Sequence, residues 1–351
     1  MPPPPASPTD PPPGRRRDVS PDAPLTAELT DAVFQRYWRS GSLKYKDFRP
    51  LTTSGSAVLQ TCHDINLNRR VVHKALHHDL TTDPIATARF VREARVTANI
   101  NHPGTAAVYE IGRNRDGDIY FTMKHIRGVD LRHVFTNLTT GDADTRRDFP
   151  LQHRLNLLTE AARTLRYAHR SGVVHRDVKP ANILAGVFGE ATLLDFGLAQ
   201  LLGPDVLPDA DGLPPGEDQR GGDAAVSLQL TNAGGRIGTP LYMSPEQARG
   251  APTDTRTDVY GWGTVLYEAL TLKPLVFGDE LEDVLAQVLD QPAPVPSAVA
   301  DSALAEPINP ALDAVCLRCL AKDPNDRFAD FGELLAALGQ ARSRRRIDPD
   351  R

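Results

Sequence analysis

Cysteine is scarce in this sequence. Only Cys62, Cys316 and Cys319 occur among the 351 residues, which excludes a disulfide framework and indicates a reducing compartment. Cys316 and Cys319 fall on one side of an apolar helical pattern, and no second Cys-x-x-Cys pair is present to complete a zinc site. We therefore expect both thiols to be core residues.

Charge of one sign and long apolar runs are also lacking. The formal net charge is only -5, so the field of the whole chain indicates neither nucleic acid nor an anionic surface as the main partner. The N-terminus has no signal-peptide pattern, and no apolar run of about eighteen or more residues follows the central region. These absences predict a cytoplasmic protein without a membrane span and without a nucleic-acid partner.

Proline, glycine and aspartate mark the parts of the chain outside the folded core. Residues 1–24 are rich in proline and predict a disordered or polyproline-like tail. Apolar residues at helical spacing predict a helical extension over residues 25–45. The main domain is expected over residues 46–341, with a polar insertion at 203–226, and a basic tail follows at 342–351.

Apolar periodicity predicts strands first and helices later. Alternating residues from Tyr45 to Leu76 favour antiparallel strands. An amphipathic helix around residues 89–96 is expected to end at His102-Pro103, because proline disfavours helical geometry in the residue before it. Two further strands, at 106–111 and 119–125, are joined by a turn at Asp116-Gly117.

The second half of the domain has mainly helical patterns. Its polar stretch 139–148 carries no such pattern and is expected to be a connection. The expected helices lie near residues 130–137, 151–170, 258–272, 281–289, 311–320 and 331–341.

One polar stretch holds the candidate chemistry. It reads His175-Arg176-Asp177-Val178-Lys179-Pro180-Ala181-Asn182, and Asp195-Phe196-Gly197 follows. Phosphoryl transfer requires a carboxylate to orient the attacking hydroxyl, a cation near the moving phosphoryl group, and oxygen ligands for Mg²⁺. Asp177, Lys179, Asn182 and Asp195 are residues of those types.

These two motifs resemble the H-R-D-x-K-x-x-N catalytic loop and the D-F-G turn of protein kinases. The lysine two residues after the aspartate is the form of serine/threonine kinases, and Met243 to Gly250 is similar to the bacterial, eukaryote-like members of that family. The resemblance covers about residues 46–341. It implies an α+β, bilobal fold: a small antiparallel β-sheet lobe with one main helix (about 46–125) and a larger, mainly α-helical lobe (about 129–341).

The resemblance also implies roles for individual residues. Asp177 and Lys179 would be catalytic, and Asn182 and Asp195 would bind Mg²⁺. Val71-Val72-His73-Lys74 resembles the V-A-I-K strand, so Lys74 would contact the ATP phosphates while paired with Glu93. Residues 123–128 resemble the hinge that binds adenine. Further contacts with ATP would come from Thr52, Ser54, Gly55, Ala57, Leu59, Val72, Met123 and His125.

Other family positions would support the fold or regulate it. Glu246 is expected to pair with Arg327, and Asp258 to brace the catalytic-loop backbone. Thr239 would contact Asp177 and Lys179 from the loop that receives the substrate. Arg176 beside the catalytic aspartate suggests control by phosphorylation of the activation segment, and the candidate sites are Thr231 and then Ser227.

The chain departs from the family in the loop over the phosphates. The glycines of G-x-G-x-x-G should fall at positions 52, 54 and 57, where this chain has threonine, serine and alanine. Glycine lets backbone amides approach phosphate oxygens without a Cβ in the way. Together with Val72 in place of the usual alanine, this predicts weaker nucleotide binding.

Three functions remain open from the sequence. The favoured one is a serine/threonine protein kinase that phosphorylates protein substrates and autophosphorylates, for which two copies would meet as a homodimer. The alternative is a pseudokinase that binds nucleotide or acts as a scaffold, because of the degenerate loop. A small-molecule phosphotransferase is less favoured, since Gly238 to Glu246 resembles a platform for peptide substrates.

Overall fold

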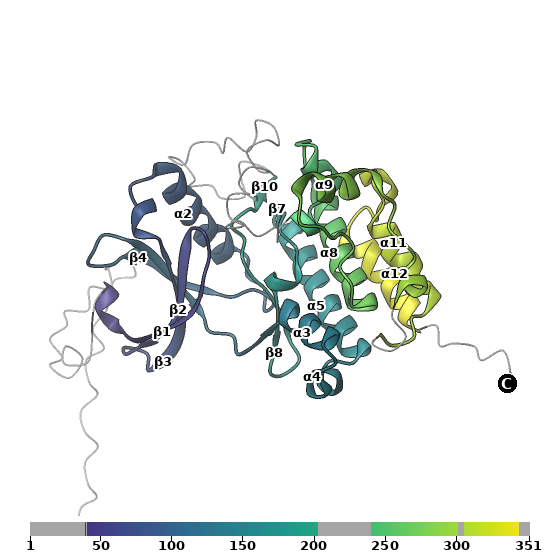
Figure 1. The fold of residues 1–351 in the computed structure, drawn as a ribbon. Coiled ribbons are helices and arrows are strands. Elements are labelled where there is room, and N and C mark those ends of the chain that lie inside the picture. Colours follow the sequence, from purple (N-terminus) through teal and green to yellow (C-terminus); the bar gives the residue numbers. More distant parts are fainter. Residues whose placement is uncertain (1–38, 40, 203–239, 301–304, 344–351) are drawn as a thin grey trace, which may run out of the picture.

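An antiparallel sheet and one long helix form the smaller lobe (Figure 1). The computed structural model describes residues 39, 41–202, 240–300 and 305–343. Within these residues the sheet has five strands in the order β1-β2-β3-β5-β4, and every neighbouring pair is antiparallel. The strands are β1 (Tyr45–Thr53), β2 (Ala57–Asp64), β3 (Arg69–Leu76), β4 (Val108–Arg113) and β5 (Ile119–Lys124).

Helix α2 (Pro84–Asn99) covers the inner face of this sheet. It begins where the Asp83 side chain accepts a hydrogen bond from the backbone N–H of Ile85, and Pro84 occupies the first turn, where its missing N–H costs nothing. The predicted stop at His102-Pro103 was wrong, because the helix already ends at Asn99. Ile100 turns to an extended conformation and is buried in the core of the larger lobe, so packing sets the end of the helix.

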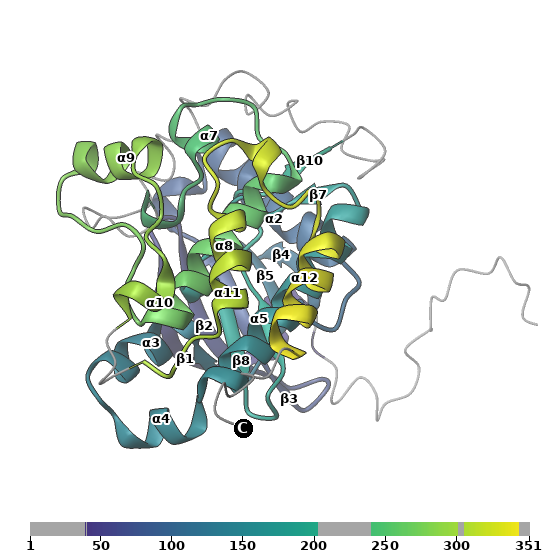
Figure 2. The same cartoon turned by 90° about the vertical axis from the view of Figure 1, so that its right-hand side faces the viewer.

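The larger lobe is helical and is built around α5 (Leu151–Arg170) and α8 (Thr255–Thr271), as Figure 2 shows. Trp262 of α8 is fully buried and its indole N–H donates to the Leu158 carbonyl of α5, 2.9 Å away. The helices around this pair are α3 (Leu131–Thr139), α4 (Ala143–Asp148), α7 (Pro245–Ala248), α9 (Leu281–Asp290), α10 (Pro296–Val299), α11 (Pro310–Cys319) and α12 (Phe331–Ser343).

Short strands lie around the polar loop between α5 and α7, and 3-10 turns occur in both lobes. The described residues include a three-stranded sheet in the order β6-β8-β9 and a β7–β10 pair. Their bounds are β6 (Gly128–Asp130), β7 (Val173–Val174), β8 (Ile183–Gly186), β9 (Ala191–Leu193) and β10 (Gln200–Leu201). The 3-10 turns are η1 (Gly41–Lys44), η2 (His78–Leu80), η3 (Pro180–Asn182), η6 (Pro240–Tyr242) and η7 (Pro324–Asp326).

Several helix predictions agree with the structure, whereas the short helices α4, α7 and α10 were not predicted. The range predicted for α5 is the observed one. The stretch 139–148 was expected to be a connection, but it contains α4, which starts where the Asp142 side chain accepts from the Thr145 N–H. A capped, charged helix with no buried side chain leaves no apolar period to detect. The sulfurs of Cys316 and Cys319 are buried free thiols, as expected of core residues.

The predictions for residues 1–24 and 203–226 concern segments outside the described residues, as do most of the extension at 25–45 and of the tail at 342–351.

His73 makes the smaller lobe sensitive to acid. This residue is 5% exposed, and its ring stacks on the Tyr120 ring with centroids 4.6 Å apart. Burial lowers the pKa of His73 from 6.5 to about 4. The unfolded chain therefore binds a proton that the folded chain rejects between these values, so stability falls as the pH falls through this window.

We expect the free energy of unfolding to fall by about 2 kcal/mol between pH 7 and pH 5 because of this histidine. Replacing it, as His73→Leu, should remove most of that loss, which urea denaturation at the two pH values would measure. His63→Leu, on the neighbouring strand, is the control. An unchanged difference between the two pH values in His73→Leu would contradict the prediction.

Candidate active site

The polar loop between β7 and η3 is held from below by helix α8. The buried Asp258 carboxylate accepts hydrogen bonds from the backbone N–H groups of His175 (2.8 Å) and Arg176 (2.7 Å). His169, near the end of α5, contacts the same carboxylate at 2.7 Å. Arg176 adopts a left-handed backbone conformation with φ +66°. This conformation costs free energy in a residue other than glycine, and the hydrogen bonds to Asp258 compensate for that cost. The predicted bracing by Asp258 is confirmed.

Three side chains of this loop meet at one carboxylate. Lys179 Nζ donates to Asp177 Oδ2 at 2.7 Å. Asn182 Nδ2 donates to the same oxygen at 3.0 Å and to the Asp177 carbonyl at 2.8 Å. Burial raises the pKa of Asp177, and the Lys179 charge offsets part of that rise. The carboxylate is therefore fixed in position and more basic than an ordinary aspartate.

The Asp195-Phe196-Gly197 turn places a second carboxylate where its charge interacts with Asp177 and Lys179. Phe196 is 2% exposed and packs against the His175 ring, with centroids 4.7 Å apart. This anchor holds Asp195 at φ +62°, with its side chain 46% exposed. A Cβ at Gly197 would lie 3.0 Å from Asp195 Oδ1, so a larger residue would crowd the carboxylate.

The side chain of Lys74, on strand β3, lies between Glu93 of α2 and Asp195 of that turn. Its Nζ contacts Glu93 Oε1 of α2 at 2.5 Å and lies 3.9 Å from Asp195 Oδ1. Burial alone would lower the pKa of Lys74, but the charges of Glu93 and Asp195 raise it on balance. The predicted Lys74–Glu93 ion pair is confirmed, and a fixed cation faces the cleft from the smaller lobe.

Asn182 and Asp195 fit a hard divalent cation such as Mg²⁺. The amide nitrogen of Asn182 is committed to Asp177, which leaves its Oδ1 as an acceptor. Burial would raise the pKa of Asp195, but the Lys74 and Lys179 charges lower it, so the carboxylate stays ionised. No cluster of three or more His, Cys, Asp or Glu side chains suited to a metal occurs in the described chain. Mg²⁺ commonly takes one or two protein ligands and completes its shell with phosphates and water.

The β1–β2 loop closes without the expected glycines. Ser54 Oγ accepts from the Ala57 N–H and also contacts the Ala57 carbonyl, both at 3.1 Å. The Ser54 N–H donates to that carbonyl at 2.9 Å, and His77 Nε2 contacts the Ser54 carbonyl at 3.0 Å. Thr52 and Gly55 are exposed, whereas Ala57 is fully buried. The serine hydroxyl therefore stabilises a turn that this loop makes in place of a glycine-rich one.

The expected adenine contacts lie on the inner face of the sheet and at its edge. Val72 of β3 is opposite Met123 of β5, and Leu59 on β2 pairs with Lys74. Val72 is 7% exposed, while Leu59, Met123 and His125 are half-buried. The register thus places Leu59, Val72 and Met123 on neighbouring strands beside Lys74.

Two supports of the site were less visible in the sequence. Gln247 Nε2 donates to the Arg176 carbonyl at 2.9 Å, and Gln247 also forms a capping box with Ser244 at the start of α7. The Ser-Pro-Glu-Gln pattern is the signal that could have identified this cap. The bond from His169 to Asp258 leaves no such local signature, because the residues are 89 positions apart.

A family model for the protein kinase domain matches residues 45–337. The chain belongs to the protein kinase family. The predicted bacterial, eukaryote-like serine/threonine affiliation and the bilobal α+β fold agree with this match and with the observed architecture.

Three curated relatives of this chain come from bacteria. The probable serine/threonine-protein kinase SCO3848 of Streptomyces coelicolor is 34% identical over 287 residues, which are 81% of this chain and 38% of the relative. Serine/threonine-protein kinase PknB of Mycobacterium tuberculosis is 35% identical over 288 residues, covering 81% and 40%. Serine/threonine-protein kinase PknD of Chlamydia pneumoniae is 33% identical over 296 residues, covering 83% and 30%. The kinase thus spans about 40% or less of the length of these relatives.

Family membership implies ATP and a divalent metal ion as cofactors. Among the described residues, no helix is both long and apolar enough to cross a membrane.

The predicted Glu246–Arg327 pair is confirmed, with Arg327 Nη1 and Nη2 donating to the two carboxylate oxygens at 2.8 and 2.7 Å. Thr231, Ser227 and Thr239 lie outside the described residues.

Proposed function

We propose that this kinase transfers the γ-phosphoryl group of ATP to serine or threonine hydroxyls of proteins, with Mg²⁺ as the metal. The observation that carries the proposal is the convergence of two groups of side chains. Asp177, Lys179 and Asn182 are hydrogen-bonded together in one loop. Lys74 links Glu93 to Asp195 on the opposite side of the cleft. A chain freed from catalysis has no physical need to keep such groups in one place.

The proposed roles follow from charge and position. Asp177, with its raised pKa, accepts or orients the proton of the attacking hydroxyl. Lys179, bound to that carboxylate, offsets charge on the moving phosphoryl group. Lys74 contacts the α- and β-phosphates while Glu93 holds it in place. When bound, Mg²⁺ would neutralise charge on the triphosphate, and Asn182 and Asp195 are its proposed ligands.

Incubation with Mg²⁺, γ-labelled ATP and a generic basic protein tests the proposal. We expect label in phosphoserine or phosphothreonine after acid hydrolysis of the protein. Label confined to a small-molecule acceptor would instead favour a small-molecule phosphotransferase. No incorporation above that of an Asp195→Ala control would favour the pseudokinase alternative and overturn the proposed function.

The β1–β2 loop gives a graded prediction. The double variant Thr52→Gly/Ser54→Gly removes two side chains from an exposed turn and brings backbone amides closer to the phosphates. It also removes the hydroxyl that stabilises the present turn, so the gain is limited. We expect Mg·ATP to bind about three- to tenfold more tightly, a change of about 1 kcal/mol. Calorimetry would measure it, and weaker binding by the double variant would contradict the prediction.

The proposal extends to regulation and setting. Autophosphorylation at Thr231 or Ser227 between two copies would need a transient homodimer, and mass spectrometry after ATP treatment would locate the phosphate. Phosphate absent from residues 227–239 in an active preparation would contradict it. The proposed setting is the cytoplasm, with protein rather than nucleic-acid partners, and the three buried free thiols support a reducing compartment.

A further inference from the structure

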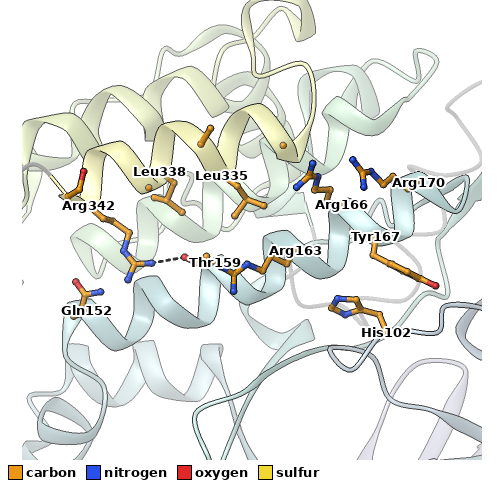
Figure 3. Close-up of a pocket in the computed structure, with 14 residues that line it drawn as sticks. His102, Gln152, Thr159, Arg163, Arg166, Tyr167, Arg170, Leu335, Leu338 and Arg342 are labelled. Carbon is orange, nitrogen blue, oxygen red and sulfur yellow. Dashed lines mark hydrogen bonds between the residues drawn. The ribbon is translucent and has the colours of Figure 1, made fainter.

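A groove lies between α5 and α12 on the larger lobe, and Figure 3 shows its lining. Its cavity volume is about 880 Å³. The side chains of Leu335 and Leu338 point from α12 toward α5 and form an apolar floor. None of the residues that line it is among the candidate active-site residues. The groove is therefore a feature separate from the cleft.

The lining of this groove is positively charged. Arg163, Arg166 and Arg170 follow one face of α5, and Arg342 faces them from α12. The fourteen residues that line the described groove include no aspartate or glutamate. Four guanidinium groups around one concave surface favour an occupant that carries several carboxylates.

Nearby carboxylates neutralise only part of this positive charge. Glu160 contacts Arg163, whose side chain remains 58% exposed. Asp330 lies beside Arg166 and Arg170, where the Glu333 N–H and, to a smaller extent, the two arginine charges lower its pKa. Arg342 donates to the hydroxyl of Thr159 at 2.8 Å and so is positioned by α5 without a carboxylate there.

The shape of the groove also leaves room for a chain. A Cβ at Gly332 would lie 2.8 Å from Asp330 Oδ1 and 3.3 Å from Arg166 Nη2, so glycine at this position leaves space for both side chains. Arg163 and Arg170 are seven residues apart on α5, which corresponds to about 10 Å along the helix. This spacing suits carboxylates two or three residues apart on an extended segment.

The kinase contains such a segment, and it begins beside the groove. The Leu202 N–H donates to the Gly172 carbonyl at 2.8 Å, two residues after Arg170 ends α5. Residues 203–226 follow. They contain six acidic residues and one arginine, the acidic ones being Asp205, Asp209, Asp211, Glu217, Asp218 and Asp223. These 24 residues span up to about 80 Å when extended, far more than the groove requires.

We propose that residues 203–226 bind in the α5–α12 groove of their own chain, with their carboxylates on Arg163, Arg166, Arg170 and Arg342. Leu335, which is half-buried at the base of the groove, offers an apolar contact for a leucine of the segment. This docking would hold residues 203–226 on a surface separate from the candidate active site. It does not depend on phosphoryl transfer, so it can hold even if the proposed function fails.

A peptide-binding experiment tests the docking. In the test variant, a short Gly-Ser linker replaces residues 203–226, and a fluorescent peptide of that sequence is added back while anisotropy is recorded. We expect the variant to bind the peptide at least about tenfold more tightly than the unmodified kinase, in which the tethered segment already occupies the groove. Adding Arg166→Glu/Arg170→Glu should weaken binding at least about tenfold, and raising the salt should weaken it as well.

Two controls make the result decisive. Arg146→Glu, at an exposed arginine on α4, should leave peptide binding unchanged. A peptide with all six carboxylates converted to amides should not bind, and this holds even if the double arginine variant folds poorly. Equal binding by the double variant, or by the amide peptide, would overturn the proposal. The proposal would also be overturned if the unmodified kinase bound the peptide less well as its own concentration rises. Such a dependence would mean that the segment of one copy occupies the groove of a second copy.

Discussion

Replacing Asp177 with asparagine should reduce phosphate incorporation about a thousandfold while leaving the fold unchanged. The amide keeps the size of the side chain but cannot accept a proton from the attacking hydroxyl, and general-base catalysis contributes factors of about 10² to 10⁴. The change also removes the charge that Lys179 contacts at 2.7 Å. Initial rates with labelled ATP at saturating Mg²⁺ would measure the loss.

The control for this variant is Asp148→Asn, at an exposed carboxylate on α4. We expect it to retain the rate and melting temperature of the unmodified kinase. Full activity in Asp177→Asn would show that the role proposed for this carboxylate is wrong. A large fall in melting temperature would show that Asp177 acts mainly through the structure of the loop.

Replacing Arg327 with alanine should destabilise the kinase by about 3–5 kcal/mol. Arg327 is 2% exposed, and its side chain binds both oxygens of Glu246 as well as the carbonyls of Ala321, Arg256 and Lys322. Its removal would leave a buried carboxylate with only the Thr257 hydroxyl and backbone as partners. Burial alone would raise the pKa of Glu246, and Arg327 is the main group that lowers it.

A second variant separates the ion pair from simple packing. Removing both charges, as Glu246→Leu/Arg327→Leu, should cost less than Arg327→Ala, because no buried charge is then left uncompensated. Urea denaturation at pH 7 would give both free energies of unfolding. A loss in Arg327→Ala no larger than in the surface control Arg146→Ala would contradict the proposed structural role.

The sequence predicted most of this architecture because its signals are local or tied to motifs. The apolar period of α5 marks its observed limits, since ten of its side chains are buried on one face. The two catalytic motifs indicated which side chains meet, and the Lys74–Glu93 and Glu246–Arg327 contacts were predicted from the resemblance to protein kinases. These pairs form in the structure because helices and strands bring together residues 19 and 81 positions apart.

Other features depend on tertiary packing or on too few residues to give a pattern. The end of α2 is set by burial of Ile100 in the other lobe, which no local pattern reveals. Strands β7 and β10 have two residues each and exist because they pair with each other. At Ser54, where the family pattern has glycine, the side-chain hydroxyl accepts from the Ala57 N–H and stabilises a turn that the motif does not predict. The basic groove combines charges from α5 and α12, which the sequence places more than 170 residues apart.

The central claim is that Lys74, Asn182 and Asp195 converge around a metal-bound triphosphate. Calorimetric titration of ATP into the kinase, with and without Mg²⁺, tests it most directly. We predict that Mg²⁺ strengthens ATP binding at least about tenfold in the unmodified kinase and has little effect in Asp195→Ala. Equal ATP affinity with and without the metal, or the same metal dependence in Asp195→Ala, would contradict the claim.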